Sequence, residues 1–225
     1  GDMTPSQVIA KAKKGELLPV YVLTGEEAYL RDQVVAELRA ASLAGGVPAF
    51  NEDKFTAGEI DADKVIAAAR TVPMMAKRRF VLVRNADRWD SGGGDGESDG
   101  RSESPLDKIA AYAQAPVDST CVVILATKLD GRRKLASLAK KQDFVVSCEA
   151  LDRRDLTDWI VDKCKDKGHD IDPDVADLLA EIAGPELAYV SDAVERLSLF
   201  AGKGQPITEH AVSECVARVR TADTW

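Results

Sequence analysis

The chain has 225 residues, of which 45% are hydrophobic and 30% are charged, and its formal net charge is −8 at pH 7. This length is enough for one large domain or two small ones with a substantial core. The negative net charge excludes a protein that binds nucleic acid through its overall charge, so any such contact must use a local basic face.

Strands and helices alternate between residues 19 and 148. Unbroken apolar runs such as residues 80–83 and 120–126 are typical of strands buried on both faces of a parallel sheet. Between the strands lie segments with helical spacing of apolar residues, and the alternation predicts an open α/β sheet with right-handed crossovers. The expected strands are residues 19–23, 54–56, 80–83, 120–126 and 144–148, and the expected helices are residues 6–14, 62–70 and segments that begin at Glu26 and Pro105.

The segment from Ser91 to Ser104, SGGGDGESDGRSES, contains no apolar side chain. A stretch of this composition cannot bury enough surface to offset the entropy of ordering it, so it predicts a mobile loop. Exposed polar loops tolerate insertions, and we expect no function there.

The pattern changes after Glu149, where only helical spacing remains. Four helices are expected, and their apolar stripes can be buried only against one another, which predicts a small helical bundle. The predicted architecture is therefore α/β followed by all-α, with an α/β domain over residues 3–149 and a helical bundle over residues 150–222. The expected helices of the bundle are residues 156–164, 174–182, 186–200 and 208–216.

The stretch from Thr71 to Trp89, TVPMMAKRRFVLVRNADRW, joins a short apolar segment, residues 72–75, to a basic turn and a buried strand. Pro73 can end the preceding helix, and Met74 and Met75 follow it. Lys77, Arg78 and Arg79 form a turn that should mostly face solvent, so the methionines beside it are candidates for an adaptable binding surface. The alternative is that both methionines cover the bottom of the core.

An α/β sheet with a helical domain suggests a nucleotide triphosphatase of the AAA+ type, and the turn after the first strand tests this. A phosphate-binding loop needs exposed backbone N–H groups, a lysine and a serine or threonine for Mg²⁺. The chain has TGEEAYLR there, without lysine, and Glu26 and Glu27 would repel a triphosphate. The strand that should end in a Mg²⁺ ligand ends in Arg84-Asn85, and ATP hydrolysis is therefore not expected.

No other catalytic, metal or cofactor set is recognisable. Motifs of serine hydrolases, zinc proteases and dinucleotide-binding folds are absent, so we expect no catalytic site and no cofactor. The four cysteines, Cys121, Cys148, Cys164 and Cys215, lack metal-ligand spacing and are expected to be core thiols of a reducing cytosol. His169 lies between two helices and is expected to be a solvated loop residue. No transmembrane span or secretory signal is found, which predicts a cytoplasmic protein without a membrane partner.

A basic segment follows the 120–126 strand. Lys128, Arg132, Arg133 and Lys134, continued by Lys140 and Lys141, concentrate positive charge at the end of a strand. The first four are candidate contacts to DNA phosphates. The alternative is an ordinary solvated helix face.

Four segments together resemble the delta subunits of bacterial DNA polymerase III, over residues 6–220. TVPMMAKRRFVLVRNAD and TKLDGRRK are the most specific, and their spacing fits apart from the polar insertion. The four segments are PVYVLTGEEAYLRDQV, TVPMMAKRRFVLVRNAD, VILATKLDGRRK and ELAYVSDAVERLSLF.

The resemblance implies a clamp-loader subunit with an AAA+-like fold and no ATP site, in a complex that is a nucleotidyltransferase. In that family an apolar pair enters a pocket of the beta sliding clamp and helps to open the ring. The matching residues here are Met74 and Met75, preceded by Pro73; the family often has phenylalanine at the second position. The implied partners are the clamp, the gamma/tau and delta prime subunits, and primer–template DNA at replication forks.

Members of the family also carry a third, helical collar domain that assembles the loader. The chain ends at Thr224-Trp225, about where that domain would begin, so we expect a chain truncated before its collar, with impaired loader assembly. Two other functions are alternatives: a divergent nucleotide-binding ATPase or kinase, and a stand-alone nucleic-acid-binding module that uses residues 128–141.

Overall fold

The computed structural model describes residues 1–90 and 103–217. The chain divides into two compact units, Gly1–Glu149 and Ala150–Trp225. The polar segment that was predicted to be a mobile loop falls almost entirely on residues 91–102, outside the described residues. Within the described ranges, no helix combines the length and the apolar character that a bilayer crossing requires.

The first unit is built on a parallel sheet, as its apolar runs predict. Its strands lie in the order β2-β3-β4-β1-β5, with β2 and β5 at the edges. In β3 the residues from Phe80 to Val83 are all buried, which confirms a strand covered on both faces. The strands are β1 (Val20–Thr24), β2 (Glu52–Thr56), β3 (Arg79–Arg84), β4 (Thr120–Leu125) and β5 (Val145–Ser147).

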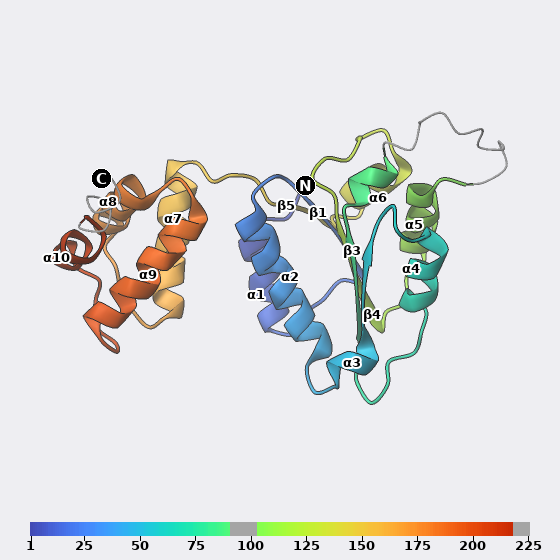
Figure 1. The fold of residues 1–225 in the computed structure, drawn as a ribbon, viewed down its shortest axis with the longest axis horizontal. Helices are drawn as coiled ribbons and strands as arrows, with labels where there is room; N and C mark the ends of the chain where they lie inside the picture. The colour runs from blue at the N-terminus through green and yellow to red at the C-terminus, as the bar shows by residue number, and fades with distance from the viewer. Residues whose placement is uncertain (91–102, 218–225) are drawn as a thin grey trace. The chain divides into compact units, whose positions relative to one another are not determined.

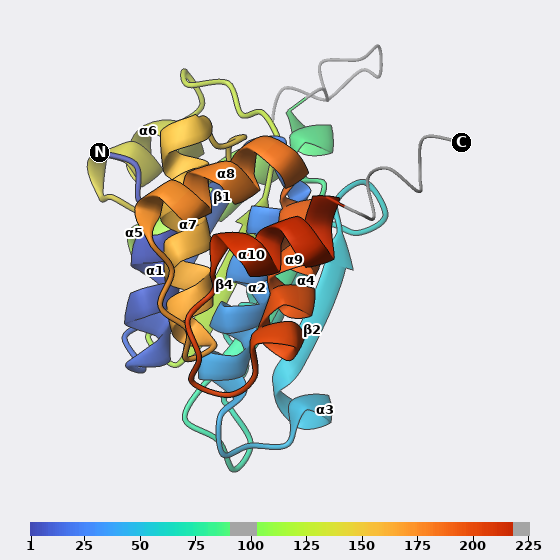
Figure 2. The same ribbon diagram turned by 90° about the vertical axis from the view of Figure 1, so that its left-hand side faces the viewer.

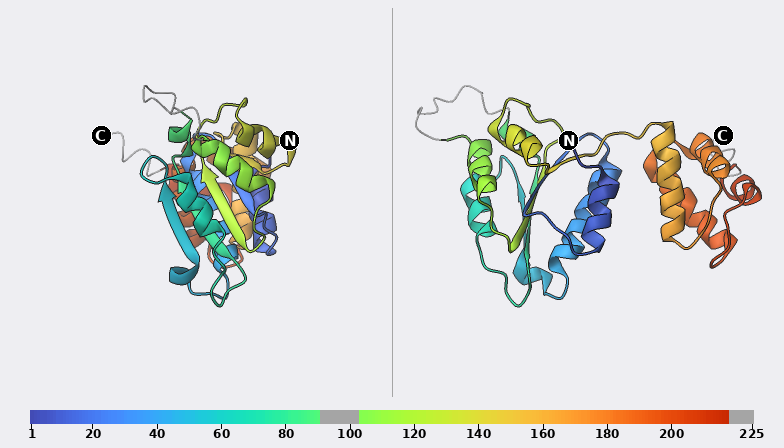
Figure 3. Two further views of the ribbon diagram at one scale, coloured as in Figure 1. Left: turned by 90° about the vertical axis from the view of Figure 1, so that its right-hand side faces the viewer. Right: turned by 180° about the vertical axis from the view of Figure 1, so that it is seen from behind.

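Helices cover both faces of the sheet (Figure 1). One face carries α1 and α2, and the other carries α4, α5 and α6, as the reverse view also shows (Figure 3). The helix α2 begins at Ala28, later than predicted, because Glu27 serves as its N-cap and accepts a hydrogen bond from the Tyr29 amide. The helices are α1 (Pro5–Lys13), α2 (Ala28–Leu43), α3 (Pro48–Asn51), α4 (Ala62–Ala69), α5 (Pro105–Gln114) and α6 (Lys134–Lys141).

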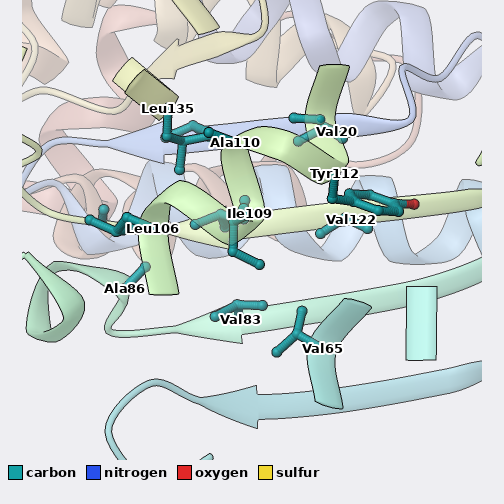
Figure 4. Packing of buried hydrophobic residues seen from close by; sticks show 14 of the residues in the cluster. Val20, Val65, Val83, Ala86, Leu106, Ile109, Ala110, Tyr112, Val122 and Leu135 are labelled. Carbon is teal, nitrogen blue, oxygen red and sulfur yellow. The ribbon is translucent and has the colours of Figure 1, made fainter. Parts of the chain in front are cut away.

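Alternate strand residues point into a core between the sheet and the helices α4, α5 and α6 (Figure 4). Leu106, Ile109 and Tyr112 of α5 lie over Val83 and Val122 of the sheet, and all five are at most 3% exposed. Because β-branched side chains pack well on a pleated surface, valines dominate the strand side of this core.

The second unit contains only helices among its described residues, which agrees with the predicted bundle. Its last predicted helix is shorter than expected, because a turn of π-helix over Ser213–Ala217 replaces its second half. The helices are α7 (Arg153–Asp166), α8 (Pro173–Ala183), α9 (Leu187–Ala201) and α10 (Glu209–Val212).

Candidate functional site

The loop of residues 71–78 joins α4 to β3 and exposes most of its apolar side chains to solvent. Met75 is 92% exposed, Val72 79% and Met74 56%, whereas Pro73 is half-buried. The alternative that both methionines cover the core is therefore wrong. Because the loop precedes β3, it lies at the amino edge of the parallel sheet.

The short helix α3 lies at the same edge, because it precedes β2 directly (Figure 2). It adds two exposed apolar side chains, Val47 at 50% and Phe50 at 57%. We call Val47, Phe50, Val72, Met74 and Met75 the apolar tip. Exposed apolar side chains that gather at one end of a soluble domain mark an interaction surface more often than scattered ones do.

A buried asparagine connects α3 to the loop. The Oδ1 of Asn51 accepts a hydrogen bond from the Met74 amide at 2.7 Å, and its Nδ2 donates to the Met74 carbonyl at 3.0 Å. The same Nδ2 donates to the Val47 carbonyl at 3.1 Å, and Asn51 is 0% exposed. The exposed loop is thus fastened to a buried side chain.

The backbone of Met75 adopts a left-handed conformation, with φ at 52°. Residues other than glycine rarely adopt this region, and they do so at a cost of roughly 1–3 kcal/mol that the surrounding structure must offset. Such residues are concentrated at binding and catalytic sites.

The basic turn beside the methionines differs from the prediction at Arg79. The prediction was a turn of three cations that mostly faces solvent, but Arg79 is only 7% exposed. It forms an ion pair with Asp53 and donates to the carbonyls of Phe50 at 2.9 Å and Ala68 at 3.3 Å. Its role is structural, because it joins β3 to α3, β2 and α4 beneath the loop. Lys77 is exposed and Arg78 is half-buried.

The basic segment lies at the opposite, carboxyl edge, because it follows β4. Two of its arginines are bound to carboxylates: Arg133 Nε donates to Asp90 at 2.7 Å, and Arg132 donates to Asp130 at 3.0 and 3.1 Å. The hydrogen bonds from Arg132 lower the pKa of Asp130 to about 2.

The two lysines among the four predicted phosphate contacts face solvent. Lys128 lies 3.9 Å from the exposed Glu26, and Lys134 is exposed at the first residue of α6. The structure thus separates the four predicted phosphate contacts into two arginines paired with nearby carboxylates, of which Arg132 is itself exposed, and two exposed lysines. It does not bring either pair near the apolar tip.

The turn after β1 also lies at the carboxyl edge, where α/β sheets usually bind nucleotides. Two of its amide groups are already used: Gly25 donates to the Thr127 carbonyl and Glu27 to the Cys148 carbonyl, each at 3.0 Å. The Glu27 carboxylate caps the first turn of α2, where a phosphate would sit. The geometry of this turn is that of a closed structural junction.

The remaining candidate ligands are dispersed. Among residues 1–90 and 103–217, no three His, Cys, Asp or Glu side chains lie together as a metal site would require. Cys121, Cys148 and Cys164 are buried, as core thiols should be, and burial raises the pKa of Cys121 to about 12. Cys215 is half-buried.

His169 contradicts its prediction, because it is 3% exposed. Its Nδ1 lies 2.6 Å from the Gln205 carbonyl oxygen and its Nε2 lies 2.7 Å from Ser198 Oγ. Since a carbonyl can only accept, Nδ1 carries the proton in the neutral ring and Nε2 accepts from the Ser198 hydroxyl. Both nitrogens have partners, so the histidine links the loop between α7 and α8 to α9 and to the loop that follows α9.

Three comparisons with known proteins agree. The sequence model of a family described as "DNA polymerase III, delta subunit" matches residues 21–149. The DNA polymerase III subunit delta of Bacillus subtilis is 33% identical over 208 residues, which is 92% of this chain and 59% of that protein. The solved structure of the Bacillus subtilis DNA clamp loader delta protein YqeN aligns with a TM-score of 0.80 at 31% identity.

That structural alignment covers 95% of this chain and 62% of the solved one. The chain therefore spans about three fifths of the length of the relatives it matches. The predicted resemblance is confirmed, and so is the predicted fold class of a parallel α/β sheet followed by helices.

Proposed function

The chain belongs to the DNA polymerase III delta-subunit family, and from that premise we propose that it binds the beta sliding clamp and helps to open it. In this proposal Met74 and Met75, preceded by Pro73, enter an apolar pocket of the clamp. This step belongs to DNA replication, in which the opened ring is loaded onto primed DNA. The other loader subunits, gamma/tau and delta prime, are the proposed partners in that complex.

The exposure of the methionine pair carries this proposal. Met75 is 92% exposed on a loop whose backbone is held by a buried side chain, which is an expensive arrangement for a residue without a partner. Fully burying a methionine side chain stabilises a complex by about 1.5–3 kcal/mol. Val47, Phe50 and Val72 would surround the pair with further apolar area.

We propose that the chain contributes binding and no chemistry of its own. The closed turn at Gly25 supports this. The Gly25 and Glu27 amides already donate to backbone carbonyls, and the Glu27 carboxylate lies where a triphosphate would bind. The alternative of a divergent ATPase or kinase has no comparable support in the geometry of this edge.

For DNA, we propose that Lys128 and Lys134 contact phosphates of the primer–template within the assembled loader. Both face solvent at the same edge of the sheet. Arg132 and Arg133 would contribute less than predicted, because Asp130 and Asp90 already bind them.

The test is capture of the chain by its cognate beta clamp, comparing wild type with the Met74→Ala, Met75→Ala double variant. We expect the double variant to bind at least about a hundredfold more weakly, since hot-spot residues each cost about 2 kcal/mol or more when truncated. Its thermal midpoint should not change, because both side chains are exposed.

A matched control exists in the second unit. Leu199 and Phe200 of α9 are 84% and 56% exposed, close to the values for the methionines. The Leu199→Ala, Phe200→Ala variant should bind the clamp as wild type does. Equal binding by both double variants and wild type would refute the proposed clamp site.

A further inference from the structure

The side chain of Asn51 binds the backbone of Met74 from both sides, at its N–H group and at its carbonyl. We propose that Asn51 is a positioning residue, which holds the loop in the one backbone conformation that presents Met74 and Met75 together. This inference rests on the proposed function, since it concerns how the same loop meets the clamp.

The chemistry of the site suits asparagine in particular. One carboxamide supplies an acceptor for the Met74 amide and donors for the carbonyls of Met74 and Val47, at 2.7, 3.0 and 3.1 Å. Aspartate would turn a negative oxygen towards two carbonyls, and an apolar residue would remove the partners of the Met74 amide and the Met74 carbonyl. The side chain is 0% exposed, so water does not compete for these bonds.

Asn51 is itself rigidly placed. It is the last residue of α3, and Glu52 continues directly into β2. Arg79 of β3 donates to the carbonyl of Phe50, next to Asn51, and pairs with Asp53 on the other side. The hydrogen bonds from the Asn51 side chain to the Met74 backbone, which we call the latch, therefore connect the exposed loop to the edge of the sheet.

A second contact fixes the loop on the far side of Met75. Gly46 approaches Ala76 so closely that a Cβ at Gly46 would lie 2.5 Å from the Ala76 Cβ. The left-handed Met75 thus stands between two fixed points, Met74 at Asn51 and Ala76 at Gly46. Without the latch at Asn51, Met75 would relax towards commoner backbone conformations, because its own conformation is costly.

Loss of the latch should therefore lower the fraction of molecules that can bind. The apparent dissociation constant rises in inverse proportion to that fraction. Releasing one residue from a single backbone conformation corresponds to about a tenfold change in population. We expect Asn51→Ala to weaken clamp binding about tenfold.

The experiment has a first arm that needs no clamp. In the isolated chain, hydrogen exchange of the Met74 amide should be slow in wild type, although the side chain is exposed, and fast in Asn51→Ala. Exchange of the β3 amides from Phe80 to Val83 should stay slow in both. Unchanged exchange of Met74 in Asn51→Ala would overturn the proposal.

The second arm measures the clamp dissociation constant. The control is Ser42→Ala, which removes another buried polar side chain, one that bonds the Leu38 carbonyl within α2. We expect Asn51→Ala to bind the clamp about tenfold more weakly than wild type and Ser42→Ala to bind it as wild type does. If Asn51→Ala fails to fold, Asn51→Asp replaces it in this second arm: it keeps an acceptor for the Met74 amide but turns a negative oxygen towards the Met74 and Val47 carbonyls, so binding should again weaken.

A comparison of Asn51→Ala with and without Met75→Ala distinguishes a positioning role of Asn51 from general destabilisation of the fold. In a Met75→Ala background, Asn51→Ala should weaken binding by clearly less than tenfold, since much of what the latch presents is gone. The same tenfold loss in both backgrounds would contradict the proposal. Wild-type binding by the Met74→Ala, Met75→Ala variant would instead refute the clamp site, and the exchange result would still test the latch.

Discussion

Arg133 Nε donates a hydrogen bond to Asp90 Oδ1 over 2.7 Å, and Arg133 Nη2 donates to the Asp90 carbonyl at 3.0 Å. Asp90 follows the turn after β3, whereas Arg133 is the N-cap residue of α6. The other carboxylate oxygen of Asp90 accepts from the Asp130 amide at 3.1 Å. Asp90 thus organises the start of the basic segment, and Arg133 belongs to that junction.

The first prediction concerns stability at this junction. Arg133→Ala should lower the free energy of unfolding by about 1–2 kcal/mol, because a mostly buried carboxylate loses its charged partner. Urea denaturation measures the change. Lys134→Ala is the matched control, since Lys134 is adjacent and exposed, and its effect should stay within about 0.5 kcal/mol. Equal stability of the two variants would show that the pair contributes nothing.

The second prediction concerns DNA. Within the loader complex, Lys128→Ala and Lys134→Ala should each weaken primer–template binding at all sequences and reduce the salt slope by about one. The reason is that each exposed ammonium would release one counterion. Binding measured between low and high salt gives the slope. Lys203→Ala, an exposed lysine in the second unit, is the control. An unchanged slope in both variants would leave the basic segment as a solvated face.

The sheet could be predicted because its signal is local. Four consecutive buried residues in β3 are apolar, and each strand carries its own pattern. Arg79 shows the limit, because a cation next to Lys77 and Arg78 is expected to be exposed. Its burial depends on Asp53, which lies 26 residues earlier in the sequence.

The candidate site was only partly predictable for the same reason. The sequence pattern alone did not decide whether Met74 and Met75 are buried in the core or exposed at the surface, and the family resemblance favoured the surface. Asn51 carried no local signal, because its partner Met74 is 23 residues away. His169 was misjudged because Ser198 and Gln205, which bury its polar atoms, come from distant elements.

The third prediction tests His169. His169→Phe should lower the free energy of unfolding of the second unit by about 1–2 kcal/mol, since it removes the part-buried hydrogen bonds of His169 to Ser198 Oγ and the Gln205 carbonyl. Denaturation of the whole chain, followed by helical circular dichroism, measures this. His210→Phe is the control, because His210 is exposed. Equal midpoints for the two variants would mean that the buried hydrogen bonds contribute little.

The fourth prediction concerns alkaline pH. Burial raises the pKa of Cys121 and Cys148 to about 12 and that of Cys164 to about 11. In the unfolded chain a thiol titrates near about 8.5, so between pH 8.5 and 11 the unfolded state binds fewer protons than the folded state. The free energy of unfolding should therefore fall as pH rises through this window, by up to about 1.4 kcal/mol per pH unit for each thiol.

Urea denaturation at pH 8, 9 and 10 tests this dependence. Cys121→Ala should have a flatter dependence on pH than wild type, because one of the titrating groups is gone. Val123→Ala, at an equally buried position of β4, should lose stability but keep the wild-type slope. The same slope in Cys121→Ala as in Val123→Ala would show that Cys121 does not contribute to the alkaline loss.

The fifth prediction tests the closed turn after β1. Gly25 has φ at +103°, and a Cβ there would lie 2.2 Å from the Cys148 carbonyl oxygen. Gly25→Ala should therefore lower the free energy of unfolding by about 3 kcal/mol or more, since both the conformation and the space exclude a side chain. Gly15 is the matched control: its φ is +78°, but nothing lies within 4 Å of a Cβ added there.

Gly15→Ala should cost only about 1–2 kcal/mol, the conformational part alone. The difference between the two glycine variants then measures how tightly β1, Thr127 and Cys148 close this edge of the sheet. Equal losses in urea denaturation would mean that the turn can open by enough to admit a methyl group. In that case the Gly25 and Glu27 amides could also be released towards a phosphate, and the structural argument against nucleotide binding at this edge would fail.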